Sequence, residues 1–421
     1  MKFQAIKGVR DILPPESALW NGVEQAAREV FHSYGYGEIR LPIFEPTELF
    51  ARSVGLDTDI VSKEMYSFED RDDSSVSLRP EATASVVRAY IEHGMHTRPG
   101  NVKLYYIGPM FRRERPQKGR YRQFNQIGAE LLGPSDHPAL DAEVIEMLLA
   151  FFARVNLQGA KLYINSIGDK NCRPAYMEQL RRELQKVRDK LGADSQRRIE
   201  TNPLRVLDSK LPEEQPIIDT LPHIADHLCD ACREQYAELK RQLALRNIEY
   251  EENWRLVRGL DYYMRTTFEI TAPGLGSQNA VCGGGRYDGL VELLGGPAAT
   301  KGIGFAIGTD RLMLSLQEQG AEAKCALDAY IAWMGVPSYP AAVALAGKLR
   351  EHNLSVELPA QKMKFGKSLN LADRLGARFA VILGEDELAA GQFTVKRLAD
   401  GEQKKLAEAD LLEYLTKSRT A

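Results

Sequence analysis

The chain has 421 residues, of which 44% are apolar and 27% charged, a composition typical of a globular protein with two or three domains. With 55 Lys and Arg residues against 58 Asp and Glu residues, the formal net charge is −3, which excludes a uniformly basic nucleic-acid-binding chain but not a local basic patch. The longest apolar run, residues 147–153, is too short to span a membrane, and the N-terminus lacks the apolar segment of a signal peptide.

The first part of the chain predicts a helix followed by an edge strand. Apolar residues recur at helical spacing over residues 16–33, with prolines before this stretch and glycines after it. A strand-like run follows over residues 38–46, and Pro42 within it favours an edge strand or a break. Such a unit would suit a subunit contact, or nearly as well the surface helix and edge strand of a monomer.

Residues 76–132 have the pattern strand, helix, strand, loop, strand. The last two strands, at residues 103–107 and 124–132, lie on the two sides of a charged loop. A helix over residues 141–155 and a short strand over residues 161–164 follow.

The next region changes in character. Residues 169–246 are charged and helical with one strand-like piece at 204–207, so we interpret them as an insertion. Strands resume at residues 248–257, 266–271 and 302–307. Strands in hairpin-like succession predict an α+β first domain with a largely antiparallel sheet.

The polar stretch 317–325 indicates a domain boundary, which predicts a first domain over residues 1–325 and a second over residues 326–421. In the second domain, strands and helices alternate, which predicts a small, partly parallel sheet covered by helices. The expected strands are 328–335, 354–359, 378–384 and 393–398, and the expected helices are 339–352, 361–375 and 407–416.

The loop within residues 111–126 carries the densest charge in the chain. Six cations so close together repel one another unless an anion is bound, and arginine favours bidentate phosphate contacts. A solvated charged hairpin is the alternative, but the flanking apolar strands and the aromatic residues Tyr121 and Phe124 favour an anion and base site. The cations, opposed by Glu114 alone, are Arg112, Arg113, Arg115, Lys118, Arg120 and Arg122.

The segments LRPEAT, FRRER, QFNQIGAE, LVRGLDYY, GGGRYDGL and GIGFAIGTDRL together resemble the histidyl-tRNA synthetases of the bacterial class II type, over essentially the whole chain. LVRGLDYY and CGGGRYDGL are similar to the signatures specific to that family. The resemblance implies a class II catalytic domain with a helical insertion, followed by an α/β anticodon-binding domain. It implies that L-histidine reacts with ATP, accompanied by Mg²⁺, to give histidyl-adenylate and pyrophosphate, and that histidine is then transferred to the 3' end of tRNA(His) by a homodimer.

Both chemical steps need charge stabilisation, so positioned cations are expected to carry the catalysis. By resemblance, Arg112 contacts the α-phosphate, and Arg258 binds the substrate carboxylate and the α-phosphate, so these two are the predicted catalytic residues. In GIGFAIGTDRL a strand is expected to run into a helix capped by Thr309, which projects Arg311 into the site. The predicted ATP-binding residues are Arg112, Glu114, Arg120, Phe124 and Arg311.

Histidine selection needs polar groups that the wrong amino acid would leave unpaired. By resemblance, Glu81, Thr83 and Gln126 take the α-ammonium group, and Glu130 and Tyr263 contact the two edges of the imidazole. The glycine-rich segment CGGGRYDGL is expected to be a loop that closes over the histidine. The predicted histidine-binding residues are Glu81, Ala82, Thr83, Arg112, Gln126, Glu130, Arg258, Tyr262, Tyr263 and Tyr287.

The five cysteines are an odd and sparse set, which favours a reducing cytoplasm over a disulfide framework. His223, His227, Cys229 and Cys232 offer four zinc-ligand types, including one C-x-x-C pair. Because a second C-x-x-C pair is absent, we interpret the segment as one amphipathic helix with a buried cysteine or two, and no metal ligand is assigned.

Two other classes of function compete with the enzyme. The regulatory subunit of ATP phosphoribosyltransferase, a non-catalytic relative, resembles the catalytic domain but lacks the anticodon domain, whereas this chain keeps Arg112, Arg258, Arg311 and a second domain. A basic-loop RNA-binding module would explain the arginines but not the carboxylates near the substrate. A ligase is therefore the favoured interpretation.

Overall fold

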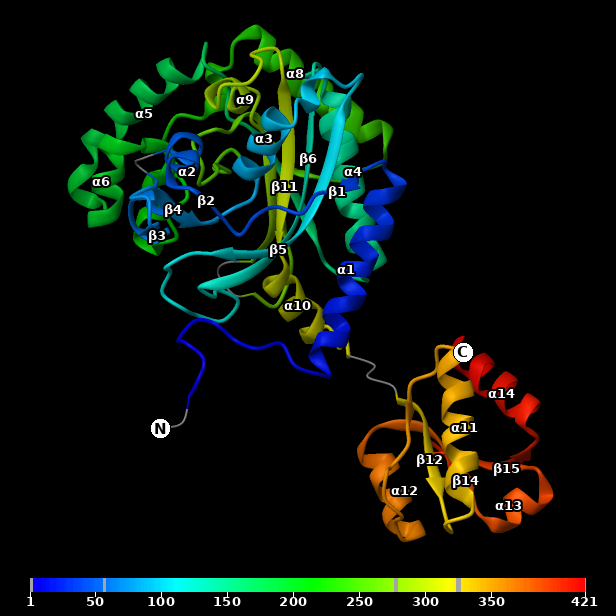
Figure 1. Ribbon diagram of the computed structural model, residues 1–421. Coiled ribbons are helices and arrows are strands. Elements are labelled where there is room, and N and C mark those ends of the chain that lie inside the picture. The colour runs from blue at the N-terminus through cyan, green and yellow to red at the C-terminus, as the bar shows by residue number, and fades with distance from the viewer. Residues whose placement is uncertain (1–2, 56–57, 276–278, 323–326, 421) are drawn as a thin grey trace. The chain divides into compact units, whose positions relative to one another are not determined.

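The computed structural model describes residues 3–55, 58–275, 279–322 and 327–420. The chain forms two compact units, a larger one that includes residues 19–322 and a smaller one that includes residues 327–420 (Figure 1). Within the described ranges, the helices are all too short or too polar to cross a membrane.

An eight-stranded sheet forms the centre of the larger unit, in the order β1-β5-β6-β11-β10-β9-β7-β8. The six inner strands are antiparallel to their neighbours, and β1 and β8 add in parallel at the two edges. This antiparallel-rich sheet confirms the predicted α+β class. The strands are β1 (Gly37–Glu38), β5 (Val102–Phe111), β6 (Gln123–Gly133), β7 (Lys161–Ser166), β8 (Glu251–Glu252), β9 (Met264–Thr271), β10 (Ala280–Arg286) and β11 (Lys301–Gly308).

One face of this sheet packs against four helices. Because side chains alternate along a strand, β6 directs Ile127, Ala129 and Leu131 into this core, where they are at most 1% exposed. Figure 1 shows the two longest of the four helices, α1 and α4, beside the long strands. The helices are α1 (Glu16–Ser33), α4 (Pro138–Arg154), α8 (Asp230–Leu245) and α10 (Thr309–Glu318).

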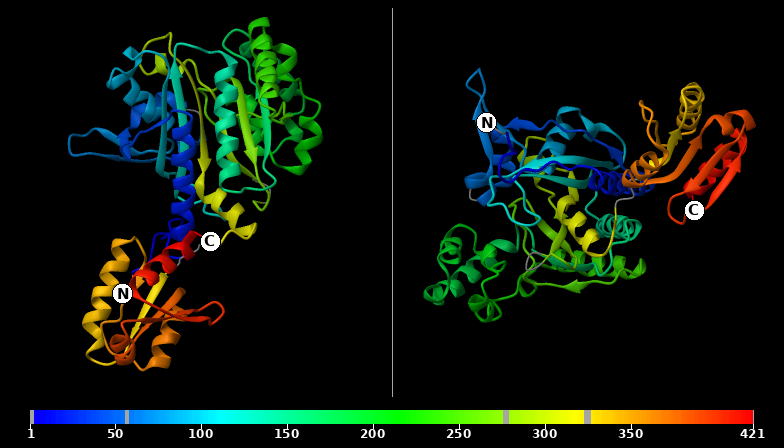
Figure 2. Two further views of the ribbon diagram at one scale, coloured as in Figure 1. Left: turned by 90° about the vertical axis from the view of Figure 1, so that its right-hand side faces the viewer. Right: turned by 90° about the horizontal axis from the view of Figure 1, so that it is seen from below.

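The opposite face meets a second apolar cluster that includes Tyr106, Met110 and Leu132. Helices α3 (Thr83–Glu92), α5 (Arg173–Lys186) and α9 (Leu290–Leu293) contribute to this cluster. A separate three-stranded sheet has the order β2 (Phe44–Pro46), β4 (Ser75–Leu78), β3 (Tyr66–Glu69), with α2 (Thr47–Val54) after β2. Figure 2 shows the β3–β4 hairpin projecting from the body of the larger unit.

Residues 169–246, the predicted insertion, are largely helical, with α5, α6 (Ala193–Thr201), α7 (Gln215–Ile218) and α8. The strand predicted at residues 204–207 is wrong, because Pro203–Val206 forms a 3-10 helix. Proline suits the first helical position and cannot donate a ladder hydrogen bond, while the buried Leu204 and Val206 satisfy the apolar pattern without a strand.

The strand predicted at residues 248–257 shrinks to the two residues of β8. The carbonyls of Trp254 and Leu256 accept hydrogen bonds from the side-chain amide of Asn165 instead of from a neighbouring strand, at 3.2 and 3.0 Å. A side-chain contact from β7 therefore holds this stretch as an ordered loop.

The helix predicted over residues 16–33 is confirmed as α1, and the strand-like run 38–46 divides into β1 and β2 around Pro42.

The loop expected at CGGGRYDGL is wrong in its first half, because residues 280–286 form the inner strand β10. The hydrogen bonds between strands join backbone atoms, so a run of glycines can form a strand. Gly284 also packs so closely on β11 that a Cβ there would overlap the Gly304 carbonyl. The expected cap is also wrong: α10 begins at Thr309, and the buried Thr309 hydroxyl has no hydrogen-bond partner.

The smaller unit has a five-stranded sheet in the order β13-β12-β14-β15-β16. The first three strands are parallel and the last two antiparallel, which confirms the partly parallel sheet. Two elements, α13 and β16, were not predicted. The elements are β12 (Leu327–Trp333), α11 (Ser338–Glu351), β13 (Val356–Glu357), α12 (Phe365–Arg374), β14 (Ala377–Leu383), α13 (Glu385–Ala390), β15 (Phe393–Arg397), β16 (Gln403–Leu406) and α14 (Glu408–Thr420).

The predicted boundary segment 317–325 lies partly outside the described residues. Helix α10 extends to Glu318, and residues 323–326 are not described. The boundary between residues 325 and 326 stays a prediction.

Candidate active site

The floor of the main pocket is formed in part by the inner strands β6 and β11. Strand alternation puts Gln126 and Glu130 on the face opposite the α1–α4 core, together with Gly304 and Ala306 of β11. A Cβ on Gly304 would overlap the carboxylate of Glu130. Gly304 therefore leaves room for the Glu130 carboxylate, while Ala306 and Gly308 of β11 line the pocket with little side-chain bulk.

Charged and aromatic side chains from four distant stretches of the chain surround this floor. Eleven of the fourteen predicted site residues line the pocket, whereas Ala82, Glu130 and Tyr287 are buried behind its wall. Glu269, Tyr106 and Leu260 also line it and were not predicted. The eleven are Glu81, Thr83, Arg112, Glu114, Arg120, Phe124, Gln126, Arg258, Tyr262, Tyr263 and Arg311.

The arginine loop between β5 and β6 is held rigidly. Arg112 donates from Nε to the Pro80 carbonyl at 2.9 Å, and its guanidinium lies 5.2 Å from the centre of the Phe124 ring. Glu114 lies 2.7 Å from Nε of Arg120. These contacts fix two guanidinium groups, one of them beside an aromatic face, an arrangement suited to a phosphate and a base.

Arg311 approaches the same end of the pocket from α10. Its Nη1 donates to the Ala280 carbonyl at 3.0 Å. Burial, and then repulsion from Arg120, lower the pKa of Arg311 from its ordinary value. A bound polyanion would relieve this crowding of positive charge.

Arg258 is fixed from two sides. Its Nη1 lies 3.1 Å from Oε2 of Glu269, its guanidinium lies 5.8 Å from the centre of the Tyr263 ring, and its buried Nε has no hydrogen-bond partner. Burial opposes the charged form, but Tyr263 and Glu269 raise the pKa of Arg258 above its ordinary value. The Arg258 guanidinium therefore stays positively charged in the pocket, and its Nε–H is still available as a hydrogen-bond donor.

Gly283 sets the space that the Arg258 side chain occupies. A Cβ on Gly283 would overlap the Arg258 guanidinium, which is the mobile end of a long side chain. We expect Gly283→Ala to lower the kcat of the predicted ligase reaction by roughly tenfold to a hundredfold, because the guanidinium is displaced by an ångström or more. Thermal unfolding and steady-state kinetics of the purified variant measure the two effects separately.

Gly284→Ala is the matched control for this prediction. Its Cβ would overlap the Gly304 carbonyl and the Phe268 ring, neither of which can move easily. Gly284→Ala should therefore lower the unfolding temperature far more than Gly283→Ala does. Full activity of Gly283→Ala would contradict the proposed position of the Arg258 guanidinium.

A buried carboxylate, Glu130, lies behind the pocket wall and is hydrogen-bonded to the pocket residue Thr83. Glu130 accepts hydrogen bonds from the hydroxyls of Thr83 at 2.7 Å and Tyr287 at 2.5 Å. Burial raises the pKa of Glu130 to about 8, although both hydroxyl donors act to lower it. Each carboxylate oxygen keeps a lone pair, so Glu130 can accept a further N–H donor.

Glu81 supports the pocket wall from the turn before α3. Its carboxylate accepts the backbone N–H groups of Thr83 at 2.7 Å and Ala84 at 3.0 Å, which fixes the start of α3. Burial raises the pKa of Glu81. Nearby, Gln126 Oε1 and the Tyr106 hydroxyl are buried without hydrogen-bond partners. Unpaired buried polar atoms around a pocket indicate a polar ligand that would satisfy them.

The histidine and cysteine segment of the insertion does not form one helix. Ile224–His227 is a 3-10 helix, and α8 begins only at Asp230. The His223 ring stacks on Trp254 with centroids 3.9 Å apart, and the His227 ring lies against Tyr176 at 5.4 Å. The two histidines therefore have aromatic partners, whereas Cys229 and Cys232 face a different set of residues.

Two family models match the chain, and they divide it between the two units. The model described as histidyl-tRNA synthetase matches residues 8–312, and the model described as anticodon binding domain matches residues 328–418. The histidine–tRNA ligase of Solibacter usitatus is 55% identical to this chain, over 98% of this chain and 99% of its own length. That of Koribacter versatilis is 54% identical, over 98% of this chain and 96% of its own length.

Solved structures agree with these matches. The apo histidyl-tRNA synthetase of S. aureus is 39% identical with a TM-score of 0.81, covering 98% of this chain and 100% of that chain. A Bacillus halodurans chain described as an ATP phosphoribosyltransferase regulatory subunit/histidyl-tRNA synthetase is 20% identical with a TM-score of 0.63, over 91% of this chain and 98% of its own, which shows the fold alone.

An antiparallel-rich sheet with an arginine-lined pocket, followed by a unit that matches an anticodon-binding model, defines the class as an aminoacyl-tRNA synthetase. Within that class, the chain belongs to the histidyl-tRNA synthetase family. The resemblance stated from the sequence is confirmed, and the full-length matches favour the ligase over the regulatory subunit.

Proposed function

We propose that the chain is a histidine–tRNA ligase that activates L-histidine with ATP and transfers it to the 3' end of tRNA(His). The single observation that carries this proposal is one pocket whose lining combines four arginines with the hydroxyl of Thr83. Arg112, Arg120, Arg258 and Arg311 supply positive charge, and the Thr83 hydroxyl donates to the buried Glu130, a polar pair suited to a small polar side chain.

In the first step, a histidine carboxylate oxygen attacks the α-phosphorus of ATP and pyrophosphate leaves. Arg258 and Arg112 are proposed to hold the carboxylate and the α-phosphate in line and to stabilise the charge that develops between them. Phe124, stacked beneath Arg112, offers its ring to the adenine, and Glu114 is placed to accept from the adenine amino group. Arg120 and Arg311 would bind the departing phosphates.

Histidine recognition is proposed around Thr83 and the buried Glu130. Glu81, Thr83 and Gln126 would take the α-ammonium group, with the unpaired Gln126 Oε1 as one acceptor. Glu130 and Tyr263 would contact the two ring nitrogens of the imidazole. The Tyr262 and Tyr287 rings pack edge to face, with centroids 5.8 Å apart and an interplanar angle of 74°, and would support the bound histidine together with the buried Ala82.

Mg²⁺ is proposed to enter with the triphosphate. The carboxylates that line the pocket, Glu114 and Glu269, already pair with Arg120 and Arg258, so most ligands of a bound Mg²⁺ would come from the phosphates and from water. When bound, the ion would neutralise charge on the β- and γ-phosphates. Arg112 and Arg258 would position the α-phosphate.

Glu130→Gln tests the proposed imidazole contact. The amide keeps the shape but cannot ionise, whereas a bound N–H donor would favour the ionised form of Glu130, and a hydrogen bond to a charged group contributes about 1.5–3 kcal/mol. We expect the KM for histidine to rise roughly 10- to 100-fold, with the KM for ATP unchanged within about twofold. Glu143→Gln, in which the lost carboxylate pairs with Lys103 away from the pocket, is the matched control. Equal KM values for the two variants would contradict the contact.

The same variant has a defined effect on the pH dependence of folding. The pKa of Glu130 rises from its ordinary 4.5 to about 8 in the folded protein, so the unfolded chain releases this proton at lower pH. The folded state binds more protons between these values, and its free energy of unfolding therefore falls as the pH rises from about 4.5 to about 8. Denaturant titrations across this range should show a shallower fall for Glu130→Gln than for the wild type.

The organisation of the chain is part of the proposal. We assign residues 1–325 to the catalytic domain, with residues 169–246 as its insertion, and residues 326–421 to anticodon binding. The exposed Lys362, Lys364 and Lys367 near the start of α12 would suit a tRNA phosphate backbone.

A homodimer in a reducing cytoplasm completes the proposal. Phe44 on β2 and Phe68 on β3 are 59% and 49% exposed, which supports a contact with a second chain at the small sheet. The described cysteines form no disulfide with one another. Sedimentation of the purified chain would report the dimer.

Histidine-dependent ATP–pyrophosphate exchange tests the function directly. The wild type should exchange labelled pyrophosphate into ATP only when histidine is present, and should charge tRNA(His) but not a tRNA for another amino acid. A histidine-binding regulatory subunit would bind histidine without exchange, and an RNA-binding module would bind tRNA without exchange. Either result would overturn the proposed ligase.

A further inference from the structure

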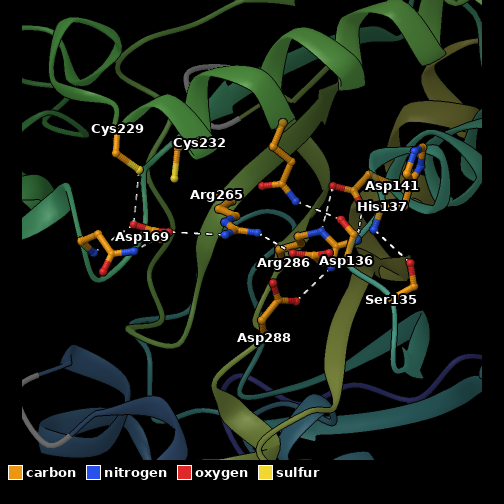
Figure 3. Close-up of polar contacts among 12 residues, drawn as sticks. Ser135, Asp136, His137, Asp141, Asp169, Cys229, Cys232, Arg265, Arg286 and Asp288 are labelled. Carbon is orange, nitrogen blue, oxygen red and sulfur yellow. Dashed lines mark hydrogen bonds and ion pairs between the residues drawn. The ribbon is translucent and has the colours of Figure 1, made fainter.

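Three cysteines and one aspartate meet where the insertion joins the catalytic sheet. Asp169 and Cys172 come from the turn before α5, and Cys229 and Cys232 come from the start of α8, sixty residues further along the chain. One ligand atom of each lies within 4.8 Å of the others, and Cys172, Cys232 and Asp169 are 6%, 1% and 3% exposed. Figure 3 shows Cys229 and Asp169 facing each other across this junction.

The distances fit a tetrahedral metal site better than a disulfide. A zinc ion with Zn–S bonds of about 2.3 Å and a Zn–O bond of about 2.1 Å has S···S edges of about 3.8 Å and S···O edges of about 3.6 Å. The Sγ atoms of Cys172 and Cys232 are 3.8 Å apart, and Asp169 Oδ1 lies 3.6 Å from Cys172 Sγ and 3.9 Å from Cys229 Sγ. A disulfide would need an S–S distance of about 2.05 Å.

The surroundings are suited to a cation held by negative ligands. Cys172 and Cys229 are the residues that immediately precede the fourteen-residue α5 and the sixteen-residue α8, so two helix N-termini favour negative charge at the cluster. Asp169 directs Oδ1 to the sulfurs, while its Oδ2 is 3.4 Å from Arg265, which also bonds Asp136 at 2.7 Å. Second-layer contacts of this kind orient metal ligands (Figure 3).

We propose that Asp169, Cys172, Cys229 and Cys232 bind one Zn²⁺ ion as a structural site. Thiolates are soft ligands that select zinc over the hard ions Mg²⁺ and Ca²⁺. Each of the three thiols gives up its proton to solvent as the metal binds, and no oxidant or reductant is involved. The D-x-x-C and C-x-x-C spacings place two ligands in each of two short turns, as structural zinc sites do.

The site would fasten the insertion to the sheet beside the pocket. The Gly168 carbonyl accepts from the backbone N–H of Arg265 at 2.7 Å, and Arg173, at the start of α5, donates to the Tyr263 carbonyl at 2.8 Å. Tyr263 lines the active-site pocket. A metal that joins the two turns therefore fixes the backbone that carries Tyr263.

Metal analysis of the untagged, full-length protein tests the proposal. Elemental analysis after dialysis against metal-free buffer should find about one zinc per chain. Exchange with Co²⁺ should give thiolate-to-cobalt charge-transfer absorption and the strong visible bands of a tetrahedral site. Protein with no zinc that also fails to bind Co²⁺ would overturn the proposal, and so would a Cys172–Cys232 disulfide found in freshly purified, metal-free protein.

Variants separate the ligands from their neighbours. The double variant Cys229→Ser with Cys232→Ser should lose the metal and its Co²⁺ spectrum, and Asp169→Asn and Arg265→Lys should weaken Zn²⁺ binding by roughly tenfold or more. His223→Ala and Cys282→Ala are controls that should retain one zinc per chain. Retention of zinc by the double variant, or its loss in His223→Ala, would contradict the ligand set. A chelator should lower the unfolding temperature of the wild type but not of the double variant.

Discussion

Arg258→Ala is expected to lower the kcat of histidine-dependent ATP–pyrophosphate exchange roughly 1000-fold, the upper range seen when one preorganised donor is removed from a transition state. Arg258 is held by Glu269 and by the Tyr263 ring, so its guanidinium is in place before substrate arrives. Its contribution grows as negative charge develops on the α-phosphoryl group, so kcat should fall more than the KM for histidine rises. Steady-state exchange kinetics measure both quantities.

Arg246→Ala is a closely matched control. Arg246 is 22% exposed and pairs with Glu146 at 3.0 Å, whereas Arg258 is 21% exposed and pairs with Glu269 at 3.1 Å. Arg246 does not line the pocket, so its loss should leave exchange unchanged. Arg258→Lys should recover only part of the activity, because lysine keeps the charge but not the planar fork. Exchange by Arg258→Ala at the rate of Arg246→Ala would refute the catalytic assignment.

Local patterns explain the parts of the fold that could be predicted. Apolar spacing with proline and glycine at the two ends sets the bounds of α1, and alternation over residues 124–132 sets both β6 and the direction of its side chains. The secondary-structure predictions failed where pairing with segments distant in sequence determines the structure. Residues 280–286 form a strand because β9 and β11 lie on both sides, and no local signal in a run of glycines reveals those neighbours.

The candidate site was predicted mainly from short motifs whose residues are carried by separate strands. Glu269 was missed because it is one of several polar residues in β9, and only the approach of Arg258 gives it a role. A charged residue among the buried positions of an inner strand is the signal that would have indicated it. The cysteine cluster was missed for the same reason: its D-x-x-C and C-x-x-C halves are far apart in the chain, and the histidines beside one half pack against aromatic rings instead.

Arg286→Met is expected to lower the free energy of unfolding of the larger unit by about 3–5 kcal/mol, the usual cost of removing one partner from a buried ion pair. Arg286 is fully buried at the end of β10, where Nε and Nη2 bond the two carboxylate oxygens of Asp141, at 3.1 and 2.5 Å. Its Nη1 bonds Asp288 at 2.9 Å (Figure 3). Burial disfavours the charged guanidinium, but the two carboxylates raise the pKa of Arg286, so the variant leaves two buried acids unpaired.

Denaturant unfolding measures the stability lost in Arg286→Met. Denaturant unfolding in a Trp333→Phe background would report the larger unit through Trp20 and Trp254. Arg154→Met removes an ion pair whose side chains are 61% and 46% exposed, and should cost less than about 1 kcal/mol. Replacing Asp141 and Asp288 with leucine in the Arg286→Met chain should recover much of the lost stability, since no buried charge then remains unpaired. A loss for Arg286→Met as small as that for Arg154→Met would show that this network does not stabilise the junction of β10 with Tyr287, the residue that bonds Glu130.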